Sequence, residues 1–134
     1  MLTHQIQLRV RYAETDRMGY AYYGNYATYF EVARVEMLRA VGITYRSLED
    51  EGILLPVAEY NIRFLLPAYY DDQLEITTTI SEMPAARITF EYETHRGDHL
   101  LNRAQTTLVF VDKVTGKPMR CPDQVRLALQ PHFR

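Results

Sequence analysis

Asp16 is the residue of this sequence best placed to do chemistry. It stands in the tyrosine- and glycine-rich stretch YAETDRMGYAYYGNY, residues 12–26, between a strand-like pattern and a helical pattern. An aspartate in such a turn often serves only the turn or a helix cap. This loop is short, however, so Asp16 is expected near the N-terminus of the following helix. Unpaired N–H groups and a partial positive charge gather at that end of a helix.

A carboxylate beside converging N–H groups can hydrolyse an acyl group. The N–H groups hold the carbonyl oxygen as negative charge develops on it, and one such donor lowers the barrier by about 2.7–4 kcal/mol. The carboxylate either attacks the carbonyl carbon or removes a proton from the attacking water. Gly24 has no side chain, so the main chain can approach a ligand closely there. The stretch therefore predicts acyl hydrolysis with Asp16 as nucleophile or general base.

The remaining reactive side chains favour no competing chemistry. The sequence has no G-x-S-x-G nucleophile motif and no glycine-rich phosphate loop after a strand. Cys121 shows no sign of activation and is predicted to be a buried or inert thiol. No metal site is predicted, because the histidines lack the spacing of metal ligands on a helix; they are His4, His95, His99 and His132.

The elements that must position Asp16 follow from hydrophobic periodicity. Residues 6–12 alternate between apolar and polar side chains, as in a half-buried strand. Residues 25–41 place apolar side chains on one helical face, and Gly42 is a plausible end of that helix. A short helix is predicted over residues 45–51, and another near the C-terminus over residues 122–130. The expected helical face consists of Tyr26, Tyr29, Phe30, Ala33, Met37, Ala40 and Val41.

After Gly52 the chain is rich in β-branched, aromatic and leucine residues. Four strand-like stretches cover residues 54–67, 72–83, 86–96 and 100–112. Helices and strands are thus segregated along the chain, which predicts an α+β fold with one antiparallel sheet of about five strands. The simplest packing lays the long helix across one face of that sheet.

Composition sets the frame for this prediction. The 134 residues fit one domain over 1–134, with 47% hydrophobic and 24% charged residues. A formal net charge of −2 gives no basic field for nucleic acid. We expect no secretory signal and no transmembrane segment, and a single cysteine fits a reducing compartment. The predicted setting is the cytoplasm.

A longer stretch carries a family resemblance. RYAETDRMGYAYYGNYATYFEVARVEMLRAVGI closely resembles the opening of hotdog-fold acyl-CoA thioesterases of the 4-hydroxybenzoyl-CoA thioesterase type. That family includes the small bacterial thioesterases associated with the Tol–Pal envelope system. The resemblance continues through LPVAEYNIRFLLPAYYDDQLEI to about Val111. It implies a hotdog fold, in which a curved antiparallel sheet wraps a long central helix. It also implies homodimers or homotetramers with active sites at the dimer interface.

The resemblance assigns roles residue by residue. It makes the chain a hydrolase of acyl-CoA thioesters with Asp16 as the catalytic carboxylate. The main-chain N–H of Tyr23 or Gly24 becomes the oxyanion donor. Many relatives have histidine where this chain has Tyr23, so no imidazole acts at this position here. Asn25 matches an asparagine at the helix start and is expected to cap the helix. Coenzyme A is part of the substrate, and no cofactor or metal is implied.

Contacts to the rest of the substrate are predicted less directly. Tyr22 and Asn25 flank the expected oxyanion donor and are candidate substrate-binding residues. Arg63 and Arg87 are candidates for the phosphates of coenzyme A, which need cationic partners. Each has a plainer alternative, because arginines on strands are often solvated surface charges. Tyrosines at this density also favour packing, which applies to Tyr12, Tyr22, Tyr26 and Tyr29. Glu31 and Arg34 are spaced like an exposed helical ion pair.

Two other functions remain open at this point. One is a hydratase or dehydratase of acyl thioesters on the same fold. Those relatives use a catalytic histidine, and this chain has none between residues 5 and 94. The other is a non-catalytic dimer that binds acyl thioesters or lipids, which the intact Asp16 motif disfavours.

Overall fold

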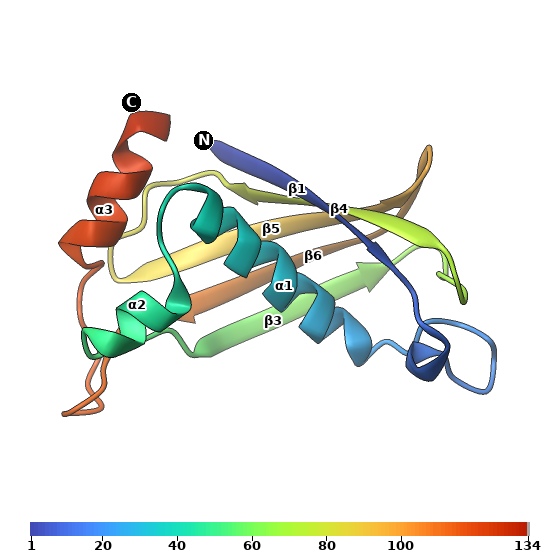
Figure 1. Cartoon of the computed structure of the whole chain (residues 1–134), viewed down its shortest axis with the longest axis horizontal. Helices are drawn as coiled ribbons and strands as arrows, with labels where there is room; N and C mark the ends of the chain where they lie inside the picture. The colour runs from blue at the N-terminus through green and yellow to red at the C-terminus, as the bar shows by residue number, and fades with distance from the viewer. Residues whose placement is uncertain (134) are drawn as a thin grey trace.

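A five-stranded antiparallel sheet with one long helix against it forms the body of the protein (Figure 1). The computed structural model describes residues 1–133. The strand order in the sheet is β1-β4-β5-β6-β3. These strands are β1 (Leu2–Arg9), β3 (Val57–Phe64), β4 (Gln73–Ile80), β5 (Arg87–Arg96) and β6 (His99–Val109). The α+β prediction with about five strands is confirmed.

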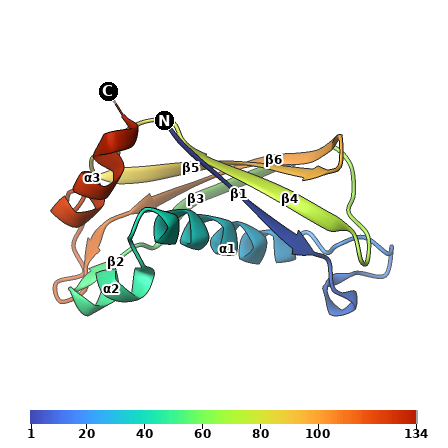
Figure 2. The same ribbon diagram turned by 45° about the horizontal axis from the view of Figure 1, so that its top comes forward.

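Helix α1 (Asn25–Ala40) lies along one face of the sheet, and the strands curve over it (Figure 2). Five residues of the predicted apolar face are buried, but Val41 is only half-buried and Ala40 is exposed; Leu38 is buried as well. The helix ends one residue earlier than the pattern suggested. Gly42 follows it with a φ of 89°, a left-handed conformation that glycine adopts without a side-chain clash.

Arg34 corrects a second expectation about this helix. The exposed Glu31–Arg34 ion pair is wrong, because Arg34 is only 6% exposed and its Nε donates to the Tyr45 hydroxyl at 3.1 Å. No salt bridge joins it to Glu31 within residues 1–133. Glu31 is exposed whereas Arg34 faces the interior, so the two side chains do not share a solvent-facing surface of the helix.

The inner face of the sheet is formed by alternate residues of the central strands. In register, Asn102 on β6 lies between Phe64 on β3 and Thr94 on β5, and Thr94 pairs with Ile76 on β4. Side chains of this inner set are buried: Leu74, Ile76, Thr78, Ile80, Ile88, Phe90, Tyr92, Thr94, Asn102, Ala104, Thr106 and Leu108. The opposite face of the sheet carries mainly polar and charged side chains.

Short connections join the last four strands of the five-stranded sheet. Strands β5 and β6 form a hairpin around Gly97, and the chain bends at Pro67 between β3 and β4. The remaining elements are α2 (Tyr45–Asp50), α3 (Asp123–Leu129), 3₁₀ turns at Tyr12–Glu14 and Gln130–His132, and the paired strands β2 (Ile53–Leu54) and β7 (Val111–Asp112). Both short helices were predicted. The predicted first strand ended too late, because β1 stops at Arg9 and Tyr12 begins a 3₁₀ turn.

Candidate active site

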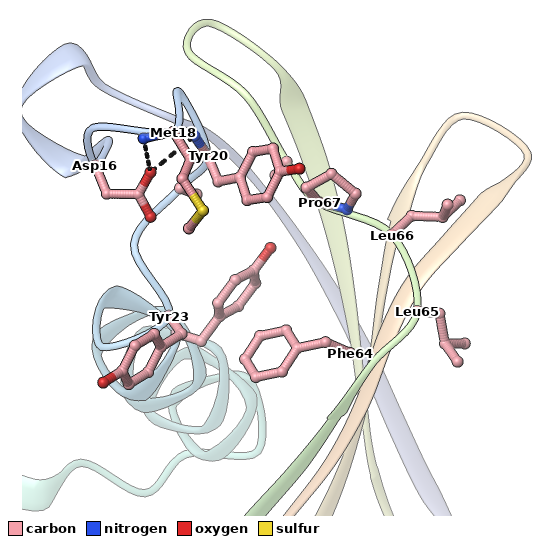
Figure 3. Close-up of a pocket in the computed structure, with 11 residues that line it drawn as sticks. Asp16, Met18, Tyr20, Tyr23, Phe64, Leu65, Leu66 and Pro67 are labelled. Atoms are coloured by element: carbon pink, nitrogen blue, oxygen red, sulfur yellow. Dashed lines mark hydrogen bonds between the residues drawn. The ribbon is translucent and has the colours of Figure 1, made fainter.

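Asp16 is fixed in a tight loop ahead of α1 by its own hydrogen bonds. Its main-chain N–H donates to the Tyr20 carbonyl at 2.8 Å, and its carbonyl accepts from Gly19 N–H at 2.9 Å. Its Oδ1 accepts from the N–H groups of Met18 (2.9 Å) and Tyr20 (3.1 Å), as drawn in Figure 3. Its Oδ2 accepts no hydrogen bond from any described residue. One carboxylate oxygen therefore holds the loop, and the other is available for chemistry.

A pocket of about 300 Å³ opens beside this carboxylate. Two segments far apart in sequence form it, namely the loop before α1 and the connection from β3 to β4. In Figure 3 the Asp16 side chain faces Phe64 and Pro67 across the pocket. Its lining residues are Asp16, Met18, Tyr20, Ala21, Tyr23, Tyr26, Phe64, Leu65, Leu66, Pro67 and Ala68. The lining is largely apolar, which suits an acyl group, with one carboxylate at its edge.

The start of helix α1 leaves two main-chain donors free. Tyr22 N–H donates to the Glu14 carbonyl at 2.8 Å, and Asn25 N–H to the Tyr22 carbonyl at 2.9 Å. Between them, the N–H groups of Tyr23 and Gly24 have no partner among residues 1–133. Gly24 is the N-cap residue of α1 and Tyr23 precedes it, where a helix leaves main-chain N–H groups unpaired. They are the groups expected to hold an oxyanion.

Glycine is needed at position 24 because a side chain there would collide with Tyr22. The Gly24 φ of −64° is open to any residue, so the conformation does not require glycine. A Cβ at Gly24 would lie 2.6 Å from the Tyr22 ring, however, which no real contact allows. A side chain at this position would displace Tyr22 and cover the neighbouring N–H groups.

Glu14 ties the Asp16 loop to helix α1, a role that the sequence did not reveal. Its carbonyl accepts from Asn25 Nδ2 at 2.7 Å. Its Oε1 accepts from the Tyr29 hydroxyl at 2.9 Å, and its Oε2 from Arg11 Nη2 at 2.8 Å. Burial alone would raise the pKa of Glu14, but the hydrogen bonds from Arg11 and Tyr29 outweigh it and hold the pKa below its usual range. The sequence carries no local signal for this contact, because Glu14 and Asn25 are eleven residues apart and meet only in the folded chain.

This arrangement also corrects the role expected for Asn25. Gly24 is the N-cap of α1, and no side chain caps the helix there. Asn25 is the first helical residue, and its amide donates backwards to the loop instead of accepting from the helix. It fixes the loop against the helix, and its side chain does not line the pocket.

Tyr26 forms the inner wall of the pocket. It is 2% exposed, and its ring lies 5.7 Å from that of Phe64, centroid to centroid. Burial raises the pKa of Tyr26 to about 12.

The other predicted substrate-binding residues lie outside this pocket. Tyr22 is 45% exposed and packs on Tyr23 at 4.6 Å between ring centroids. Arg63 lies on the outer face of the sheet, in register with Arg103. Arg87 lies at the start of β5 and forms an exposed ion pair with Glu59 at 3.9 Å. The fold does not bring either arginine to Asp16, and their contact with coenzyme A stays a prediction.

The rest of the described chain offers little for other chemistry. Burial raises the pKa of the Cys121 thiol to about 11, so it is a poor nucleophile near neutral pH. Residues 1–133 contain no group of three or more His, Cys, Asp or Glu side chains that could hold a metal ion. None of the helices in this range has the length and apolar character to span a bilayer.

Comparison with known proteins shows the family. The model of the thioesterase-like superfamily matches residues 10–129, which include the Asp16 loop, α1 and every strand of the sheet except β1. The chain belongs to the thioesterase-like superfamily. Its similarity to an acyl-CoA thioesterase, YbgC, from Haemophilus influenzae is 34% identity over 122 residues, 90% of each protein.

Further thioesterases resemble the chain in sequence and in structure. A putative acyl-CoA thioesterase, YneP, from Bacillus subtilis is 31% identical over 115 residues, covering 85% of this chain and 83% of that protein. The crystal structure of a DHNA-CoA thioesterase from Staphylococcus aureus superimposes with a TM-score of 0.86 at 31% identity. That superposition covers 99% of this chain and 85% of the other. The thioesterase-like chain therefore shares the fold of this Staphylococcus aureus thioesterase over nearly its whole length.

Proposed function

We propose that this thioesterase-like chain hydrolyses acyl-CoA thioesters to a free carboxylic acid and coenzyme A. One observation carries the proposal: Asp16, with one carboxylate oxygen unpaired, and Tyr23 both line the same apolar pocket at the start of α1. The relatives named as acyl-CoA thioesterases support the thioester as substrate.

In this proposal the acyl chain occupies the pocket, and the thioester carbonyl lies at the start of the helix. The free N–H groups of Tyr23 and Gly24 stabilise the oxygen as it becomes negative. Asp16 Oδ2 either takes a proton from the attacking water or attacks the carbonyl carbon itself. The C–S bond then breaks, and the sulfur of coenzyme A leaves as the thiol after taking up a proton. In the second route, water hydrolyses the resulting acyl-aspartyl anhydride. No cofactor is needed in either route.

The functional form in this proposal is a homodimer or homotetramer in the cytoplasm. Strand β3 is a sheet edge whose residues are mostly exposed, including Val57, Tyr60 and Phe64. Such an edge presents unpaired main-chain groups that another strand can pair with. The single cysteine fits a reducing compartment. Light scattering after size-exclusion chromatography measures the oligomer mass directly, and a monomer would contradict this part of the proposal.

The test of the activity is a thiol-release assay on a panel of acyl-CoAs from acetyl to palmitoyl, with benzoyl-CoA included. We expect Asp16→Asn, whose amide oxygen can still accept the hydrogen bonds from Met18 and Tyr20, to lower kcat by about 10²–10⁴ with a melting temperature close to that of the native chain. Asp16→Ala should lower kcat by as much, and its melting temperature should also fall because both loop hydrogen bonds are lost. Asp98→Asn, in the exposed β5–β6 turn, is the matched control and should retain full activity.

Three outcomes would contradict the proposal. Near-native turnover by a folded Asp16→Ala variant would remove Asp16 from the reaction. Saturable acyl-CoA binding without thiol release would indicate a binding protein. Addition of water to an enoyl-CoA, without loss of coenzyme A, would indicate a hydratase.

A further inference from the structure

Arg96 ties the connection between β3 and β4 to the end of strand β5. Its Nη1 donates to the Pro67 carbonyl and to Asp72 Oδ2, both at 2.9 Å. Its guanidinium also lies 5.9 Å from the centre of the Tyr69 ring, which is close enough for a cation–π contact. All three contacts reach residues 67–72, a segment that lies more than one strand away from Arg96 in the chain.

The ion pair between Arg96 and Asp72 is shielded from water. The two side chains are 30% and 23% exposed, whereas those of the Arg103–Glu93 pair on the neighbouring strands are 66% and 45% exposed. A shielded, charge-assisted hydrogen bond stabilises more than an exposed ion pair does. Asp72 Oδ2 also accepts from the Tyr69 N–H at 2.8 Å. One carboxylate oxygen therefore joins Arg96 to the turn that leads into β4.

The segment that Arg96 holds forms one wall of the pocket beside Asp16. Residues 65–68 line the pocket, and Pro67, whose carbonyl accepts from Arg96, faces the Asp16 side chain in Figure 3. The wall is also hydrogen-bonded to the Asp16 loop, because the Ala68 carbonyl accepts from the Ala21 N–H at 2.7 Å. Arg96 thus fixes a wall that is directly attached to the loop of the carboxylate.

A second connection leads from this segment to Asp16 through Tyr20. Tyr69 and Tyr20 pair as an antiparallel bridge, and their rings meet edge to face at 5.6 Å between centroids. The main chain of Tyr20 holds Asp16 twice: its N–H donates to Oδ1 at 3.1 Å, and its carbonyl accepts from the Asp16 N–H at 2.8 Å. A continuous set of contacts therefore joins Arg96 to the carboxylate of Asp16.

We propose that Arg96 is a positioning residue for the hydrolysis, because it fixes through these contacts the direction in which Asp16 Oδ2 points. This inference rests on the proposed function, since it takes Asp16 as the reacting carboxylate. Arg96 does not line the pocket, so it acts on the geometry of the site and not on the substrate. A misplacement of a reacting group by about 1 Å can lower a rate by about 10². Turnover should therefore depend on Arg96.

The first test measures thiol release from the best acyl-CoA substrate. Arg96→Met keeps a long side chain without donors and should lower kcat by about tenfold, with a smaller change in KM. Arg96→Lys keeps a charge and donors, and it should restore kcat to within about threefold of the native value. Asp72→Asn keeps an acceptor for the Tyr69 N–H but loses the charge. It should lower kcat by about threefold to tenfold, and it serves if Arg96→Met does not fold.

A double-mutant cycle separates positioning from a general structural role. In Asp16→Asn, whose residual rate is measured in single turnovers with excess enzyme, Arg96→Met should cause no further loss, because the group that it positions no longer reacts. A second loss of about tenfold in this background would overturn the inference, since it would mean that Arg96 only maintains the pocket. Arg103→Met, which removes the exposed pair with Glu93, is the matched control and should keep the native kcat.

Amide hydrogen exchange separates this inference from the proposed function, because it needs no substrate. Arg96→Met should speed the exchange of the Tyr20 and Ala21 N–H groups by about tenfold and leave that of Phe30 in α1 unchanged. Native turnover in both Arg96→Met and Asp72→Asn would overturn the role of Arg96 and leave the hydrolase intact. A native chain that releases no thiol would refute the hydrolase, and faster exchange at Tyr20 would then still support the hold of Arg96 on the Asp16 loop.

Discussion

The two ends of the inner face of the sheet differ in the polarity of their buried side chains. Near the start of α1, the row through Phe64, Asn102 and Thr94 contains unpaired polar groups and borders an open pocket. Farther along the same strands, Leu108 and Ile88 form an apolar row that is 0% and 1% exposed. The strands, hydrogen-bond ladder and facing helix are shared, so backbone architecture does not account for the difference.

The two rows contribute differently to the stability of the protein. The apolar row removes large side chains from water, which is the main source of stability. The polar row leaves hydrogen-bonding capacity unused in the interior, which lowers stability. Substitutions at the two ends should therefore have opposite consequences for unfolding and for turnover.

The largest expected effect is on stability, at the apolar end. Phe90 is 0% exposed, and Phe90→Ala should lower the free energy of unfolding by about 3–5 kcal/mol through lost burial and the cavity left behind. Urea denaturation measures this change. The variant should keep near-native kcat per folded molecule at low temperature. A loss below 1 kcal/mol, or a selective loss of turnover, would remove the contrast between the two ends.

The next effect is on turnover, at the polar end. Gly24→Ala should lower kcat by about tenfold, because the new methyl group displaces the Tyr22 ring and crowds the free N–H groups. The Tyr22 ring is exposed enough to move, so the melting temperature should change little.

Gly42→Ala is the matched control at the other end of the helix. It should destabilise the protein by about 1 kcal/mol, since Gly42 has a left-handed φ, and leave kcat unchanged. Equal losses of kcat in Gly24→Ala and Gly42→Ala would contradict a local effect at the start of α1.

The smallest effect concerns how the stability of the protein depends on Glu14, which joins the Asp16 loop to helix α1, as the pH falls. The pKa of Glu14 is lowered in the folded chain, so its charge stabilises the fold above the unfolded-state pKa of about 4.3. That contribution disappears as pH falls through the folded pKa. Glu14→Gln should be less stable than the native chain by about 1 kcal/mol at pH 7, and the gap should close below about pH 4. Thermal melts from pH 3 to 7 measure it. A gap that is independent of pH would place the effect in packing instead of charge.

The helices and strands could be predicted from the sequence because each depends on a pattern of nearby residues. The alternation in β1 and the apolar face of α1 each depend on neighbours within a few residues. Their elements were predicted with boundaries wrong by up to a few residues, as at Tyr12 and Ala40. The Asp16 motif was equally visible, because loop and helix are adjacent in the chain.

By itself, the sequence determined the α+β class, the order of elements and the carboxylate ahead of a helix. Only the tertiary structure decided that Asn102 lies fully buried between Phe64 and Thr94, that Glu14 accepts a hydrogen bond from the Tyr29 hydroxyl, and that Arg34 faces the interior. It also placed Arg63 on the outer face of the sheet. Periodicity fixes which side chains share a face of one element. Which elements meet, and in what register, depends on contacts between residues far apart in the chain, and no local pattern encodes those contacts.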